Sequence, residues 1–86
     1  MSYFSFRGTL YEVTGVSPVD EPGFHYECWD LTAGSGGDLG RIIVPEADNG
    51  DDEQIQIRLK RDVPAQVFLR WMHFVPELEQ HGINPD

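Results

Sequence analysis

Cysteine and histidine are the residue types in this chain that most readily serve as nucleophile, general base or metal ligand. The chain has one cysteine, Cys28, and three histidines, His25, His73 and His81. His25 lies three residues from Cys28, and on a strand this spacing directs the two side chains to opposite faces. No CxxC or HxxxH spacing indicates a zinc site. We therefore expect Cys28 to be a small core residue, and the protein not to be an enzyme and to hold no metal or cofactor.

A glycine-rich stretch, Ala-Gly-Ser-Gly-Gly-Asp, occupies residues 33–38. Loops that bind phosphate follow a strand and open a helix, and a P-loop also carries a lysine followed by serine or threonine. Here the loop lacks that lysine and leads into an apolar run at residues 39–44 that is typical of a strand. The pattern predicts a hairpin connection.

The most acidic segment is residues 46–53, with five carboxylates and no basic residue. Asp48, Asn49, Asp51 and Asp52 have the oxygen ligands that Ca²⁺ prefers. Their spacing does not match an EF-hand, which places a glycine at the sixth position and a glutamate at the twelfth. We therefore predict a solvated loop, whose carboxylates at Asp48, Asp51 and Asp52 contribute to the acidic rim of a binding surface.

Length and charge limit the classes of function. Eighty-six residues predict one domain, and 15 acidic against six basic residues give a net charge of −9. Such a surface repels nucleic acid and anionic lipid, and it suits docking on a basic protein. A lone cysteine fits a reducing compartment, and the chain shows neither an apolar leader nor the ~20-residue apolar run of a membrane span. We expect a cytoplasmic protein without nucleic-acid or membrane partners.

The elements that would position these residues are clearest between Glu53 and Gly82. Apolar residues alternate with polar ones from Ile55 to Lys60, which is the period of a half-buried strand. The sequence Asp62-Val-Pro-Ala then predicts a helix start capped by Asp62. Gly82 is typical of a helix stop.

The helix itself is predicted by one stripe of apolar residues at helical spacing, formed by Val67, Trp71, Val75 and Leu78. Pro76 should interrupt or restart the helix, because proline lacks an N–H and disfavours helical backbone at the preceding residue. An alternative interpretation makes residues 67–75 a fifth strand, since valine and aromatic residues also suit a sheet.

The N-terminal half predicts strands. Residues 3–16 can form one long strand or two short ones with a bend at Gly8, and residues 17–23 are a loop rich in proline. Residues 24–31 form a further strand that we place centrally because both faces carry large apolar groups. On it Tyr26 and Cys28 point to one face, while Glu27, Trp29 and Leu31 point to the other.

These elements predict an α+β protein with a four-stranded, mainly antiparallel sheet and one C-terminal helix; a small five-stranded β-barrel is the alternative. One helix about 10–12 Å wide cannot cover a whole four-stranded sheet. We expect Tyr11, Val13, Trp29 and Leu31 to lie on the uncovered face.

The leading functional hypothesis is therefore a small acidic module, of the inhibitor, immunity-factor or accessory-subunit type, that binds a protein. Its surface would comprise Tyr11, Trp29 and Leu31 with an acidic rim that includes Glu27, and its partner would be a basic protein or a second copy of the chain. The alternative is a small-molecule-binding module or minor enzyme with a pocket near Trp29 and His25.

Overall fold

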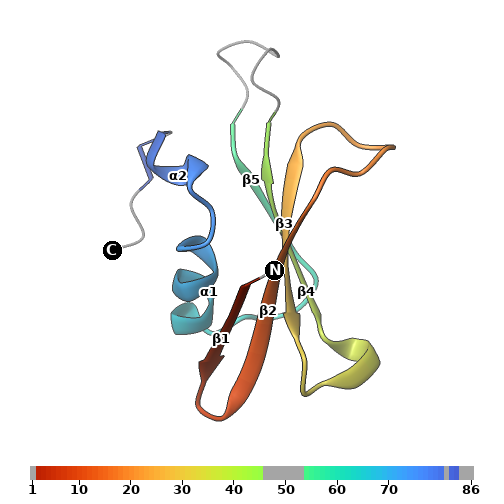
Figure 1. The fold of residues 1–86 in the computed structure, drawn as a ribbon, viewed down its shortest axis with the longest axis vertical. Coiled ribbons are helices and arrows are strands. Elements are labelled where there is room, and N and C mark those ends of the chain that lie inside the picture. The colour runs from red at the N-terminus through yellow and green to blue at the C-terminus, as the bar shows by residue number, and fades with distance from the viewer. Residues whose placement is uncertain (1, 46–53, 81, 84–86) are drawn as a thin grey trace.

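The computed structural model describes residues 2–45, 54–80 and 82–83, which form an open sheet of five antiparallel strands with two short helices on one side (Figure 1). The strands follow one another in space as in sequence: β1 (Ser2–Phe6), β2 (Thr9–Val16), β3 (Phe24–Asp30), β4 (Asp38–Val44) and β5 (Gln56–Leu59). The helices are α1 (Ala65–Met72) and α2 (Glu77–Gln80), and a 3₁₀ turn (Gly34–Gly36) connects β3 to β4. The α+β class is thus confirmed, and the predicted central strand is the third of five.

The prediction of four strands was wrong because the N-terminal stretch contains a tight hairpin. Arg7 and Gly8 both have positive φ, 51° and 82°, as a two-residue type I′ turn requires. Phe6 therefore faces Thr9 directly, and β1 and β2 are separate strands. Because β1 and β5 lie at opposite ends of the strand order, the sheet is open and the barrel alternative is not formed.

Helix α1 confirms the helical interpretation for residues 67–72, and residues 73–75 form a turn rather than the alternative strand. It begins directly after Pro64 with no side-chain cap, so the predicted role of Asp62 as the cap was wrong. Pro76 separates α1 from α2, and the Gly82 N–H donates to the Glu79 carbonyl oxygen at 3.1 Å. Across the described residues, no helix has the length and apolar character needed to cross a membrane.

The core lies between the helices and one face of the sheet, here called the covered face. The predicted stripe forms its helical side, with Val67, Trp71, Val75 and Leu78 all 2% exposed or less. The Trp71 indole N–H donates to the Tyr26 carbonyl oxygen at 3.2 Å, so the largest buried side chain is also tied to the centre of the sheet.

One aromatic contact and one hydrogen bond hold the C-terminal segment against the sheet. Phe4 stacks between Tyr11 and Phe74, with ring centroids 5.0 and 6.0 Å away. The Tyr26 hydroxyl donates to the Glu77 carboxylate at 2.8 Å. Burial and this carboxylate raise the pKa of Tyr26 to about 12. Both helices are therefore fixed to the covered face.

A β-bulge in β4 sets which residues face away from the helices. Cys28 pairs with Gly40 and Trp29 pairs with Asp38, so Leu39 is an extra residue, and it points into the core with 3% exposure. Gly40 has a φ of 131°, and a Cβ there would lie 2.2 Å from the Arg58 carbonyl oxygen. The bulge consequently needs glycine at position 40, and it places Asp38 beside Trp29.

Candidate functional site

The face of the sheet opposite the helices, here called the helix-free face, is organised in rows that cross the strands. Directly paired residues of antiparallel strands point to the same face. The pairing gives three such rows: Val16–His25–Ile43–Gln56, Thr14–Glu27–Arg41–Arg58 and Tyr3–Glu12–Trp29–Asp38. Leu10 extends the face beyond the third row. His25 of the first row and Glu27, Arg41 and Arg58 of the second form what we call the ionic cluster. The third row carries the exposed aromatic groups.

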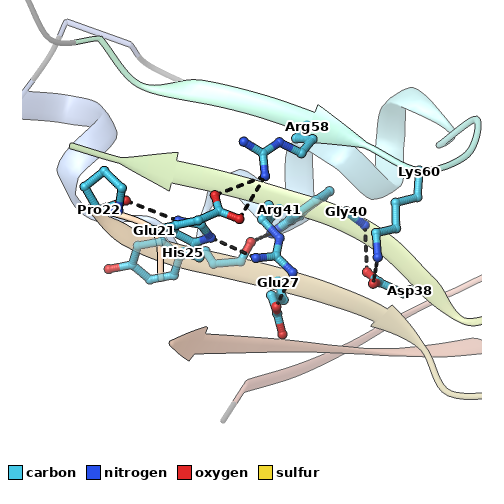
Figure 2. Close-up of polar contacts among 11 residues, drawn as sticks. Glu21, Pro22, His25, Glu27, Asp38, Gly40, Arg41, Arg58 and Lys60 are labelled. Carbon is cyan, nitrogen blue, oxygen red and sulfur yellow. Dashed lines mark hydrogen bonds and ion pairs between the residues drawn. The ribbon is translucent and has the colours of Figure 1, made fainter. Parts of the chain in front are cut away.

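Arg41 is the centre of the ionic cluster (Figure 2). Its guanidinium donates to the Glu27 carboxylate at 2.8 Å and to His25 Nδ1 at 2.9 Å. Because arginine can only donate, Nδ1 must accept, so the ring hydrogen is on Nε2, which lies 3.4 Å from the Pro22 carbonyl oxygen. Both nitrogens of His25 are therefore engaged, and its side chain is fully buried.

The loop between β2 and β3, residues 17–23, lies over this end of the helix-free face. It is held by the contact of Pro22 with the imidazole and by an ion pair between Glu21 and Arg58 at 3.2 Å. At the other end, Lys60 pairs with Asp38 at 2.7 Å (Figure 2). The three cations of this face thus each have a carboxylate partner, and the pairs cancel in charge.

Beside the cluster lies an apolar surface, here called the docking patch, formed by Tyr3, Leu10, Trp29 and Leu31. Tyr3, Leu10 and Leu31 are 53%, 42% and 43% exposed, and Trp29 is partly exposed. The Leu31 N–H donates to the Leu10 carbonyl oxygen at 2.9 Å, which sets these two residues opposite each other. Leu10 and Leu31 are therefore cross-strand neighbours, and Tyr3 and Trp29 lie on either side of Glu12 on the same face.

Glu12 is the polar residue inside the docking patch. It pairs with Tyr3 on one side and with Trp29 on the other. A hydrogen bond with Glu12 is the main cause that raises the pKa of the Tyr3 hydroxyl, with the negative charge of Glu12 as the second cause. The carboxylate is thus flanked by two aromatic rings.

The structure places the predicted site residues differently from one another. Trp29 and Leu31 lie on the helix-free face as expected, but Tyr11 does not. It pairs with Asp30, which is next to Trp29 on β3 and therefore points to the opposite, covered face. Tyr11 is 8% exposed in the core, where burial raises its pKa, and Val13 is 4% exposed on the same covered face. The expected surface of Tyr11, Val13, Trp29 and Leu31 does not form.

The remaining predicted residues also change role or fall outside the description. Glu27 lies on the helix-free face, yet its carboxylate is bound to Arg41. Asp48, Asp51 and Asp52 lie outside the described residues, as does His81. The predicted solvated loop and acidic rim of residues 46–53 thus lie outside the described residues.

Sequence reasoning missed Tyr3, Leu10, Glu12 and Asp38. The signal that could have found the first three is the dipeptide Arg7-Gly8 between two alternating stretches. A two-residue loop there pairs residue 6 with residue 9. Odd-numbered residues of β1 then share a face with even-numbered residues of β2. The place of Asp38 could be predicted only by anticipating the β-bulge. The glycine at position 40 is the one sign of that bulge in the sequence.

Cys28 and His25, the two candidates for chemistry on β3, are both fully buried. Burial, with a smaller contribution from Asp30, raises the pKa of the Cys28 thiol to about 12. Trp29 and His25 lie on the same face of β3, four residues and about 13 Å apart along the strand. Among the residues that the structure describes, no three His, Cys, Asp or Glu side chains are grouped to hold a metal ion.

Comparison with protein-family models, with curated proteins and with solved structures yields no match to this chain.

Proposed function

We propose that this protein is a non-catalytic interaction module that binds a partner protein through the docking patch on its helix-free face. The observation that carries the proposal is the partial exposure of Tyr3, Leu10, Trp29 and Leu31 on a face to which neither α1 nor α2 packs. Tryptophan and tyrosine are the residues that most often dominate the energy of protein interfaces. Exposed apolar side chains that gather on one face are a usual mark of a protein contact.

Charge supports a basic partner. The chain carries a net charge of −9, while the described cations of the helix-free face are already paired with carboxylates. Long-range attraction would therefore accelerate encounter with a basic protein, and the aromatic groups would supply affinity after contact. An inhibitor, immunity factor or accessory subunit would work in this way. The lone Cys28, which cannot form an intramolecular disulfide, supports action in a reducing compartment such as the cytoplasm.

The non-catalytic part of the proposal is supported by the state of the nucleophile and base candidates. The Cys28 thiol is protonated at neutral pH, because its pKa is about 12, and it lies inside the core. The ring nitrogens of His25 are occupied by Arg41 and Pro22. Neither group is available to a substrate in this arrangement.

The test is site-specific photo-crosslinking in cells that produce the protein. A photoreactive phenylalanine derivative replaces Tyr3 in the docking patch, and a matched variant carries it at Leu69, which is 44% exposed on α1. We expect a discrete crosslinked species from position 3 and none from position 69. We expect that species to disappear when Trp29→Ala is added, while the variant keeps its far-UV circular dichroism spectrum.

The molecular mass of the crosslinked species identifies the kind of partner. A species of twice the mass of the chain would show a second copy, and any other discrete mass would show a different protein. Equal labelling from positions 3 and 69, or labelling that Trp29→Ala leaves unchanged, would refute docking on this patch.

A further inference from the structure

The third row of the helix-free face alternates aromatic and acidic side chains across four strands. Tyr3 pairs with Glu12, Glu12 with Trp29, and Trp29 with Asp38. Neighbouring strands lie about 4.8 Å apart, so the four side chains stand in a line of about 14 Å. An aromatic face next to a carboxylate attracts a cation twice, through the ring quadrupole and through the formal charge.

Glu12 differs from the other carboxylates of this face. Glu21, Glu27 and Asp38 pair with Arg58, Arg41 and Lys60 respectively. In the described part of the chain, no arginine or lysine forms an ion pair with Glu12, whose cross-strand neighbours are the two aromatic residues. The row therefore has a cation at one end, Lys60 on Asp38, and an acidic position without one at its centre.

We infer that Glu12, Tyr3 and Trp29 form a receptor for an arginine side chain of a partner protein, which rests on the proposed docking function. The planar guanidinium stacks on the indole of Trp29 and directs N–H groups to the Glu12 carboxylate. Apolar residues beside that arginine cover Leu10 and Leu31. The partner segment is thus basic and amphipathic.

Both parts of this recognition already occur within the chain. The Arg7 guanidinium lies 5.3 Å from the centre of the Phe6 ring. The Arg41 guanidinium donates to Glu27 at 2.8 Å on the same face as Glu12. Arginine rather than lysine fits the row, because only a planar fork combines stacking with directed donation.

The test uses N-acetyl-arginine amide as the probe and follows it by nuclear magnetic resonance of the isotope-labelled protein. We expect saturable shifts of the Trp29 indole N–H and of the Glu12 amide. The indole N–H of Trp71, which is fully buried, is an internal control that should not move. N-acetyl-citrulline amide, which has the same shape without the charge, should produce no saturable shift.

Two variants decide the role of the row. Glu12→Gln should weaken binding of the arginine probe about three- to tenfold, as expected for loss of one exposed charge contact beside a ring. Trp29→Ala should weaken binding of the probe by a similar factor. Glu79→Gln, which changes an exposed carboxylate on α2, should leave binding unchanged.

Shifts of similar size with citrulline or in the Glu12→Gln variant, or shifts spread over all exposed carboxylates, would overturn the inference. The proposed docking function has a separate outcome. If position 3 crosslinks to a partner as strongly in the Glu12→Gln background as in the parent, while Trp29→Ala abolishes crosslinking, the patch docks a partner and the arginine receptor is wrong.

Discussion

The two faces of the sheet are built from the same strands but are held by different interactions. On the covered face, aromatic and aliphatic side chains exclude water, and the few polar groups, such as the Trp71 indole and the Tyr26 hydroxyl, each have one partner. On the helix-free face, charged side chains pair across strands and leave an apolar patch in contact with water.

We expect this difference to separate stability from the proposed recognition of a partner. Burial of apolar surface makes the largest favourable contribution to folding, whereas exposed ion pairs contribute about 0–1 kcal/mol each. Residues of the covered face should therefore control unfolding, and residues of the docking patch can be exposed to a partner without weakening the core. A module of 86 residues has a small core, so this division leaves little stability to spare.

The largest effect should come from Trp71→Ala on the covered face. The side chain is fully buried and fills the space between α1 and the sheet, so its removal should lower the free energy of unfolding by about 3–5 kcal/mol. The exposed neighbour Arg70→Ala should change it by about 0.5 kcal/mol or less. Denaturant titration measures both, and similar small losses for the two variants would contradict the assignment of the core face.

A second effect should appear at alkaline pH. Burial raises the pKa of Cys28 from 9.0 to about 12, and burial with Glu77 raises that of Tyr26 from 10.0 to about 12. The folded protein then holds these protons more tightly than the unfolded chain. The stabilisation is complete below about pH 9 and is lost as pH rises towards 12.

For Cys28 the loss should be at most on the order of 4 kcal/mol, at about 1.4 kcal/mol per tenfold change in the acid dissociation constant. The measurement is the free energy of unfolding between about pH 8 and pH 11, compared with Cys28→Ala, which removes the thiol. A variant as pH-dependent as the parent would show that the thiol does not contribute.

The smallest of the three effects sharpens the comparison within the helix-free face. Arg41→Leu leaves the Glu27 carboxylate and His25 Nδ1 without their donor in a partly buried site, and should cost about 1–3 kcal/mol. Arg58→Leu removes an ion pair whose arginine side chain is 54% exposed, and should cost less than about 1 kcal/mol. Both free energies of unfolding are measured by denaturant titration. Equal losses for the two variants would mean that burial does not make the Arg41 contacts stronger than the Arg58 ion pair.

The sequence by itself predicted most of the elements and the buried face of the helical segment. The stripe from Val67 to Leu78 reports local periodicity, and its four apolar residues do face the core. The alternation from Ile55 to Lys60 predicted the strand β5, but the predicted burial of one face was wrong, because Ile57 and Leu59 are 50% and 46% exposed on this last strand of the sheet. The opposite directions of Cys28 and Trp29 could be predicted from strand parity alone. The helix was identified although Pro76 divides it, because the apolar stripe continues across the break.

Only the tertiary structure decided which faces of different strands join. That choice depends on register, which a shift of one residue reverses: the pairing of Tyr11 with Asp30 placed Tyr11 on the covered face, and the bulge before Gly40 set Asp38 beside Trp29. The pairing of His25 with Arg41 and the row of Tyr3, Glu12 and Trp29 likewise arise from cross-strand neighbours far apart in sequence. Local periodicity contains no information on such neighbours, because it describes each strand separately.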